Sequence, residues 1–256
     1  MVNDIIVNDI VMKKFGLLGF PLGHSISAKY FTAKFENEAI DARYDKYELD
    51  SLDKFRALVS DPELCGLNVT IPYKEKVIPL LDELDETAEA IGAVNVIKIT
   101  RSNGKIHSKG YNTDALGFEN SLKQSIKPYH KFALILGSGG AAKAVYYVLK
   151  IFDIQPIYVS RTPKADMLTY SDLNREIIEK NLLIVNATPT GMFPNIDDCP
   201  PIPYDFITDK HLLVDVIYNP PETLFLTKGK KHGATTINGE GMWQGQANET
   251  WRIWNE

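Results

Sequence analysis

Apolar and polar positions along the first hundred residues alternate between short buried runs and helix-spaced patterns. Residues 15–19 form an apolar run that ends in glycine, which predicts a buried strand, and a turn-rich loop follows over 20–27. Tyr30, Phe31, Phe35 and Ala39 then recur at spacings that place most of them on one face of a helix. The pattern predicts further strands over 44–49, 64–71, 93–99 and near Gly110, and helices over 52–58 and from Pro72.

A turn at Asn103-Gly104 is expected to join the last two of these strands as a hairpin. From Lys131 onward, strand and helix signals alternate regularly. Strands are predicted over 132–136, 155–159, 182–185, 212–217 and 235–237, and helices over 141–151 and 242–254. Strands separated by helix-length segments indicate an α/β protein with a mostly parallel, doubly wound sheet in its second half, and the boundary between the halves is expected within 114–131.

Composition narrows the classes of partner. The chain has 256 residues and a net charge of −5 without a basic block, which argues against a nucleic-acid partner, and no apolar run approaches the ~20 residues that span a bilayer. Cys65 and Cys199 lack metal or redox spacing, so two free thiols in a reducing compartment are expected, with no metal site. Residues 1–11 read as an extension rather than a secretory signal, which predicts a soluble, cytoplasmic protein.

A glycine cluster marks the start of the second half. Gly137, Ser138, Gly139, Gly140, Ala141 and Ala142 directly follow the buried strand over 132–136 and fit the pattern G-x-G-x-x-A. In a dinucleotide site the first glycine makes the tight turn, the second lets backbone approach a pyrophosphate, and the helix N-terminus attracts the phosphates. The alternative is a tight strand–helix turn without a ligand.

The next strand is expected to indicate which dinucleotide binds. Where an NAD enzyme usually has a carboxylate for the ribose hydroxyl, this chain has Ser160, Arg161 and Thr162. Arginine offers a planar fork of donors that suits a 2′-phosphate. We therefore expect NADP as the cofactor, the alternative being an exposed basic loop.

Three polar clusters precede the glycine loop. Ser25 and Ser27 lie just ahead of a predicted helix and either bind a carboxylate or cap that helix. Asn68 and Thr70 alternate on one side of a strand, and Lys74 is expected in the first turn of a helix, where the dipole disfavours a cation and so favours a neutral amine able to act as a base. The alternative is an exposed lysine, like nearby Lys76.

The third cluster is the segment 110–114, which ends in Asp114 at the expected junction of the two halves. Its carboxylate either faces a cleft or caps the helix that is predicted to begin at Ala115. No single cluster decides the function.

Taken together, these segments closely resemble the shikimate dehydrogenase family. The matching stretches run from about residue 15 to 246 in the family's order: 19–27, 68–74, 92–95, 111–114, 137–142, 186–192, 215–220 and 238–242. The resemblance implies reversible, NADPH-dependent reduction of 3-dehydroshikimate to shikimate in aromatic amino-acid biosynthesis. It also implies a substrate domain over 12–114 and 240–256, a Rossmann-type NADP domain over 115–239, and a C-terminal helix that returns to the first domain.

The resemblance implies a role for each matching residue. Lys74 and Asp114 would transfer the proton; the substrate would be bound by Ser25, Ser27, Thr70, Asn95, Tyr218 and Gln246, and the nicotinamide side lined by Thr188, Ile217 and Gly239. Ala28 and Ala115 depart from the family's usual proline and glycine and affect loop stiffness. Ser160 replaces a usual asparagine and weakens the NADP assignment slightly.

Two alternatives stay open at this level. A relative acting on quinate or another cyclic hydroxy acid, with NAD as a possible cofactor, would share most of these residues. A non-catalytic NADP-binding regulator could use the same fold, although the presence of both Lys74 and Asp114 counts against it. The expected partners are small molecules, and the chain is expected to be a monomer or homodimer.

Overall fold

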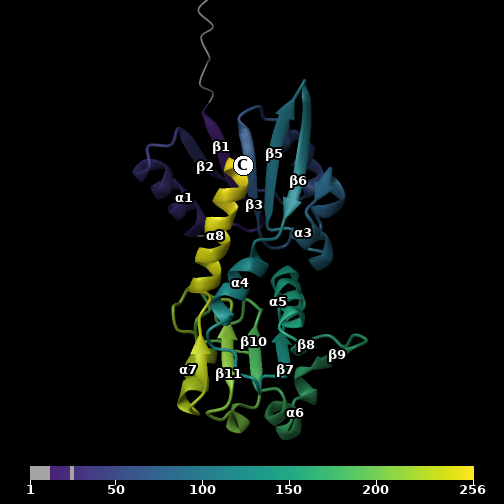
Figure 1. Ribbon diagram of the computed structural model, residues 1–256, viewed down its shortest axis with the longest axis vertical. Helices are drawn as coiled ribbons and strands as arrows, with labels where there is room; N and C mark the ends of the chain where they lie inside the picture. Colours follow the sequence, from purple (N-terminus) through teal and green to yellow (C-terminus); the bar gives the residue numbers. More distant parts are fainter. Residues whose placement is uncertain (1–11, 24–25) are drawn as a thin grey trace, which may run out of the picture. The chain divides into compact units, whose positions relative to one another are not determined.

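The computed structural model describes residues 12–23 and 26–256, which divide into two compact units (Figure 1). One unit holds the described residues up to Leu84 together with Asn95–Gly110. The other holds Asp85–Val94 and Tyr111–Glu256. The predicted extension over 1–11 lies outside the described residues.

The first unit is built on a mixed six-stranded sheet in the order β2-β1-β3-β5-β6-β4. Strand β1 pairs in parallel with β2 and β3, β3 pairs antiparallel with β5, and β4 pairs in parallel with β6. The strands predicted from the apolar runs are confirmed, whereas the two-residue β4 was too short to give a pattern. The strands are β1 (Lys13–Gly19), β2 (Ala42–Glu48), β3 (Leu64–Val69), β4 (Glu83–Leu84), β5 (Val96–Ser102) and β6 (Lys105–Tyr111).

The predicted hairpin is also confirmed. Strands β5 and β6 are neighbours, and the two residues between them, Asn103 and Gly104, both have positive φ, 51° and 73°. A two-residue type I′ turn requires this left-handed conformation at both positions, which is why Asn-Gly is favoured there.

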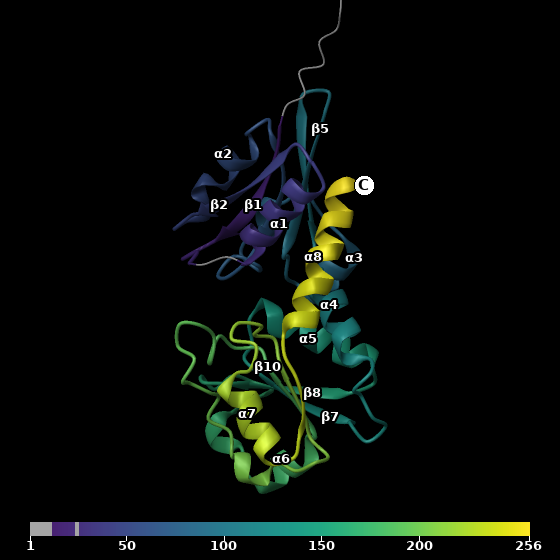
Figure 2. The same ribbon diagram turned by 90° about the vertical axis from the view of Figure 1, so that its left-hand side faces the viewer.

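Helix α1 (Ile26–Asn37) packs on β1 and β2 (Figure 2). Phe31 and Phe35 are buried, and the Phe31 ring stacks on Tyr44 of β2 with centroids 5.0 Å apart. The predicted aromatic face is therefore confirmed up to Phe35, while Ala39 lies beyond the helix with a φ of 51°. The short helices of this unit are η1 (Leu52–Lys54), α2 (Phe55–Val59) and η2 (Ile78–Leu80).

The helix predicted to begin at Pro72 does not form. Residues 71–77 make turns and lead only into the three-residue 3₁₀ helix η2. Pro79 explains the difference, because it has no N–H to donate and its ring clashes with the preceding helical turn. Lys74 therefore lies in a turn, and the expected effect of a helix dipole on its ammonium group is wrong.

The second unit contains a parallel six-stranded sheet in the order β12-β11-β10-β7-β8-β9. This is the doubly wound arrangement that the alternating pattern predicted, since strands on both sides of β7 continue in parallel. The three-residue β9 was not predicted. The strands are β7 (Phe132–Leu136), β8 (Gln155–Ser160), β9 (Met167–Thr169), β10 (Leu183–Asn186), β11 (Leu212–Asp215) and β12 (Thr235–Ile237).

Both faces of this sheet are covered, because alternate residues of its central strands enter two separate cores. Ala133 and Ile135 pack with α4, α5 and α8, whereas Leu134 and Leu136 pack with α6 and α7. The helices are α3 (Glu86–Ile91), α4 (Asp114–Leu122), α5 (Gly140–Ile151), α6 (Arg175–Lys180), α7 (Leu224–Lys231) and α8 (Glu240–Asn255), with the short η3 (Tyr170–Asp172) and η4 (Tyr204–Phe206).

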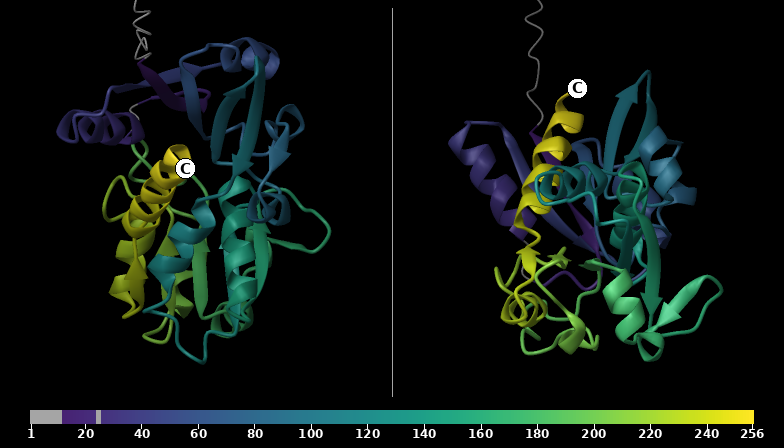
Figure 3. Two further views of the ribbon diagram at one scale, coloured as in Figure 1. Left: turned by 45° about the horizontal axis from the view of Figure 1, so that its top comes forward. Right: turned by 60° about the horizontal axis from the view of Figure 1, so that its bottom comes forward.

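Helices α4 and α8 lie side by side in this unit (Figure 3). Glycine residues allow their close approach. A Cβ on Gly117 would lie 2.3 Å from the Met242 carbonyl oxygen, and one on Gly245 would lie 2.8 Å from the Gly117 Cα. Only residues without a side chain permit such contact. The close packing fixes Asp114, at the start of α4, relative to the first turns of α8.

Candidate active site

Several polar residues predicted to act on a ligand gather at one edge of the first sheet. Because β3 runs antiparallel to β5 with Asn68 opposite Val96, the end of β3 meets the start of β5. The Val69 N–H donates to the Asn95 carbonyl at 2.8 Å, and the Thr70 N–H donates to the Leu18 carbonyl at 2.9 Å. Thr70 and the buried Asn95 thus lie at the edge where β1 also ends.

The loop after β1 is tightly joined to this edge. The Phe20 N–H donates to the Ile71 carbonyl at 3.0 Å, and a Cβ on Gly19 would lie only 2.5 Å from the Thr70 Cγ2. Gly19 is therefore required beside Thr70. Helix α1 is the next element after β1, so Ser27, near its start, is expected toward the carboxyl edge, where parallel strands commonly bind ligands.

Ser27 is the second residue of α1, so the prediction that it caps the helix is wrong. Ser25, the other proposed carboxylate ligand, lies outside the described residues. Lys74 follows Thr70 by one turn, since the Tyr73 N–H donates to the Thr70 carbonyl at 2.9 Å. Lys74 is half-buried, whereas Lys76 is exposed. This difference in burial distinguishes the two lysines, which the sequence alone did not.

The glycine loop in the second unit has the space that a dinucleotide needs. Gly137 has a φ of 103°, and a Cβ there would meet Thr188 and Ala187 at 3.0–3.1 Å. A Cβ on Gly139, by contrast, would have no atom within 4 Å, and Gly139 precedes α5 without a side-chain cap. Backbone N–H groups and open space at a helix N-terminus fit a pyrophosphate.

Ser160, Arg161 and Thr162 follow at the end of β8. The register pairs Leu136 with Val159, so these residues lie at the same sheet edge as Gly137. The Thr162 N–H donates to the Ser160 Oγ at 3.3 Å, which shapes the turn, and Arg161 is exposed. An exposed guanidinium at this edge can receive a phosphate.

A buried polar network joins the ends of β10 and β11. The Asp215 Oδ1 accepts the Asn186 Nδ2–H at 3.1 Å and the Ile217 N–H at 3.0 Å, and its Oδ2 accepts the Thr223 hydroxyl at 2.6 Å. The Asn186 Oδ1 in turn accepts the N–H and hydroxyl of Thr188, at 3.1 and 2.6 Å. Thr188 and Ile217, both predicted at the nicotinamide side, are thereby held through one carboxylate.

Burial raises the pKa of Asp215 from 3.8 to about 6, against the lowering effect of its hydrogen bonds to Thr223, Ile217 and Asn186. A carboxyl whose pKa is higher in the folded than in the unfolded protein stabilises the fold below pH 4 and loses this contribution as the pH rises through 6. We expect the unfolding free energy of the wild type to fall by roughly 3 kcal/mol relative to Asp215→Asn between pH 4 and 7. Urea denaturation across this range measures it; a difference that does not change with pH would contradict the assignment.

Asp114 is the first residue of α4 and is buried, and the side chain of Asn112, just before the N-cap Thr113, accepts a hydrogen bond from the first turn of the helix. The Asn112 Oδ1 accepts the Ala115 N–H at 3.2 Å, whereas the N-cap Thr113 makes no side-chain cap. The capping alternative for Asp114 is therefore wrong. In α8, Gln246 lies one turn after Met242, which contacts α4 at Gly117.

Gly239 and Tyr218 complete the predicted set. A Cβ on Gly239 would lie 2.2 Å from the Val216 carbonyl oxygen, and the Gly239 N–H donates to the Ile217 carbonyl at 2.9 Å. The Tyr218 ring packs at 5.7 Å on Trp243, a residue of α8 that the sequence did not single out. Burial raises the pKa of the Tyr218 hydroxyl.

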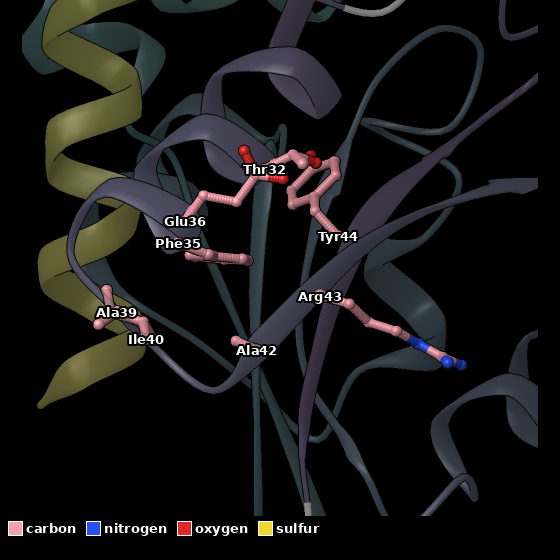
Figure 4. Close-up of a pocket in the computed structure, with 8 residues that line it drawn as sticks. All are labelled: Thr32, Phe35, Glu36, Ala39, Ile40, Ala42, Arg43 and Tyr44. Atoms are coloured by element: carbon pink, nitrogen blue, oxygen red, sulfur yellow. The ribbon is translucent and has the colours of Figure 1, made fainter.

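A hollow of about 430 Å³ between α1 and β2 contains none of the predicted site residues (Figure 4). Its one arginine, Arg43, points away from the neighbouring labelled side chains and donates to Asp45 at 2.9 Å.

Over residues 12–23 and 26–256 the side chains of His, Cys, Asp and Glu form no cluster of three that could hold a metal ion. Within the same ranges, each helix is too short or too polar to cross a membrane.

Comparisons with known proteins agree on one family. Residues 17–97 match the family described as the shikimate dehydrogenase substrate binding domain. A shikimate dehydrogenase (NADP(+)) from Desulforamulus reducens is 35% identical over 93% of this chain and 88% of its own. A shikimate dehydrogenase solved in complex with NADP+ aligns with a TM-score of 0.82, 33% identity, and 95% and 90% coverage. Quinate dehydrogenase from Corynebacterium glutamicum in complex with NAD aligns with a TM-score of 0.81 and 26% identity, over 94% of this chain and 93% of its own.

Proposed function

The chain belongs to the shikimate dehydrogenase family, and from that premise we propose that it catalyses the reversible, NADPH-dependent reduction of 3-dehydroshikimate to shikimate, a step of aromatic amino-acid biosynthesis. The observation that carries the proposal is the open glycine loop at the sheet edge that also bears Arg161. A non-catalytic regulator would need this loop but would not need Lys74 or Asp114.

NADPH fits the residues of the second unit. The pyrophosphate would bind the glycine loop and the N-terminus of α5, because open space lies over Gly139. The 2′-phosphate would bind Arg161, and the nicotinamide would lie along Thr188, Ile217 and Gly239; Ser138, Gly140, Ala141, Ser160 and Thr162 complete the proposed cofactor site. When bound, NADPH supplies the hydride for the substrate carbonyl.

The substrate is proposed to bind residues 12–114 together with 240–256. Ser25 and Ser27 would bind its carboxylate. Thr70 and Asn95 would bind its hydroxyl groups, which suits the position of these two residues at the edge where β1 and β3 end. Gln246 and Tyr218 complete the proposed set of substrate-binding residues. Anchoring the carboxylate away from the reacting carbon would present one face of the ring to the nicotinamide.

Lys74 and Asp114 are proposed to move the proton. In the oxidation direction the hydroxyl must lose its proton as the hydride leaves, so a base must contact that oxygen. Neither residue is needed by the local fold as a cap, since the Asn112 side chain accepts the Ala115 N–H in the first turn of α4 and Lys74 lies in a turn.

The proposed function is tested by steady-state rates with four pairs of substrates. Shikimate and quinate are each assayed with NADP+ and with NAD+, and formation of the reduced cofactor is followed by absorbance. The highest kcat/KM is expected for shikimate with NADP+. A higher kcat/KM for quinate with NAD+ would instead favour the activity named for the Corynebacterium glutamicum neighbour.

Substituting Ser27→Ala should lower kcat/KM for shikimate about tenfold or more, because the carboxylate would lose a hydroxyl donor. Stability should change by less than about 0.5 kcal/mol, since Ser27 lies inside α1, where alanine is a better helix former. Kinetics with shikimate and thermal unfolding measure the two effects. Ser27→Thr keeps a hydroxyl and is the control; normal kinetics in Ser27→Ala would place the carboxylate elsewhere.

A further inference from the structure

The carboxylate of Asp215 joins two loops that leave neighbouring strands. Strands β10 and β11 are parallel and in register, with Asn186 opposite Asp215. The loop after β10 carries Thr188 and the loop after β11 carries Ile217. Asp215, Asn186 and Thr223 have no exposed surface, so their hydrogen bonds form where competing water is excluded.

We propose that Asp215 is a positioning residue for hydride transfer, which acts by fixing the Thr188 and Ile217 loops relative to each other. The inference rests on the proposed function, in which these two loops line the nicotinamide. The single atom Oδ1 receives one donor from the last residue of β10, the Asn186 Nδ2–H, and one from the loop after β11, the Ile217 N–H. Moving either loop would break a buried hydrogen bond to a charged group, which costs more than an exposed one.

Asn186 transmits this restraint to Thr188. Its Nδ2 donates to Asp215 and also to the Thr190 carbonyl at 3.3 Å, which fixes the amide orientation. Its Oδ1 then accepts both donors of Thr188. Thr188 in turn lies against the glycine loop, since its Cγ2 would be 3.0 Å from a Cβ on Gly137. One chain of contacts therefore links Asp215 to the expected pyrophosphate loop.

The Ile217 loop is held from the other side by Gly239. The Gly239 N–H donates to the Ile217 carbonyl. Gly239 also packs so closely on Val216 that any side chain at position 239 would clash with the Val216 carbonyl. The Val216 N–H donates to the Asn186 carbonyl at 3.0 Å. With both its N–H and carbonyl bound, Ile217 has little freedom, and a displacement of about 1 Å at such a position can cost ~10² in rate.

The chain offers a matched control in Thr223. Its hydroxyl binds the other oxygen, Oδ2, and caps α7 by accepting the Leu226 N–H at 3.4 Å. Thr223→Val should therefore destabilise the protein, by loss of a cap and a buried hydrogen bond, while both loops stay bound to Oδ1. Asp215→Asn keeps an Oδ1 acceptor for both loops and is the conservative variant.

The experiment compares Asp215→Ala, Asn186→Ala, Asp215→Asn and Thr223→Val in three measurements. Amide hydrogen exchange at Thr188 and Ile217 is measured in the cofactor-free protein, NADPH affinity by fluorescence, and kcat with protiated and deuterated NADPH. The two alanine variants should show at least tenfold faster exchange and a tenfold to hundredfold lower kcat, with a larger deuterium effect and less than fivefold weaker NADPH binding. Asp215→Asn and Thr223→Val should stay within about threefold of wild type in kcat.

A lower melting temperature in the alanine variants with unchanged kcat and isotope effect would overturn the inference, because the network would then be structural only. Equal loss of kcat in Thr223→Val would also overturn it. If the alanine variants do not fold, the prediction rests on Thr223→Val and Asp215→Asn, in which unprotected Thr188 and Ile217 amides would contradict it. A wild type without NADP-dependent oxidation of shikimate would instead refute the proposed function, while the exchange measurement would still test the restraint on the loops.

Discussion

Replacing Lys74 by alanine is expected to lower kcat by ~10²-fold or more, the usual scale of general acid–base catalysis. The amine is proposed to hold or accept the proton of the reacting hydroxyl, and alanine cannot replace it. NADPH affinity should stay within about threefold, because the cofactor is proposed to bind residues of the other unit. Steady-state kinetics and a fluorescence titration with NADPH measure the two quantities separately.

Lys76→Ala is the matched control, since Lys76 lies two residues away and is exposed. Its kinetics should match the wild type. A Lys74→Ala variant with near-normal kcat would remove the catalytic role, and equal effects in both variants would indicate a general change of the loop after β3.

Replacing Arg161 by alanine is expected to weaken NADP+ by roughly 1.5–3 kcal/mol, about tenfold to 150-fold in Kd, and to leave NAD+ nearly unchanged. Only NADP+ carries the 2′-phosphate that the guanidinium is proposed to bind. The ratio of the two dissociation constants, measured by calorimetry, gives the contribution of this contact. The magnitude should fall with added salt, because Arg161 is exposed.

Lys164→Ala tests whether any nearby positive charge would suffice. It should change NADP+ affinity by less than about threefold, since a lysine offers a point charge rather than a bidentate fork. Equal weakening of NADP+ and NAD+ by Arg161→Ala would show that this arginine does not bind the 2′-phosphate.

Most of the fold could be predicted from the sequence because the buried strands produce continuous apolar runs. The five strands predicted for the second sheet and the helix after Gly137 lie within two residues of the predicted limits. The helix expected from Pro72 was wrong because Pro79, farther along, decides the local structure. Single-residue signals such as Pro72 or Ser27 specify where a helix can begin, but tertiary contacts decide whether it does.

The candidate site was predictable only where a motif carries its own physical reason. The glycine loop and Arg161 could be identified from spacing and residue type. Asp215 and Asn186 could not be assigned a role, because their importance comes from register between strands 29 residues apart in the chain. The available signal was that the two apolar strands β10 and β11 each end in a polar residue, Asn186 and Asp215. A buried carboxylate needs hydrogen-bond partners, so the two residues could have been expected to pair.

The most direct measurement follows the conversion of 3-dehydroshikimate by proton NMR, with NADPH and the purified chain, beside Lys74→Ala prepared in parallel. The wild type should form shikimate in an amount equal to the NADPH oxidised, and the variant should form it at least ~10²-fold more slowly. NADPH binding without shikimate formation by the wild type would contradict the proposed dehydrogenase activity and favour a non-catalytic role for this fold.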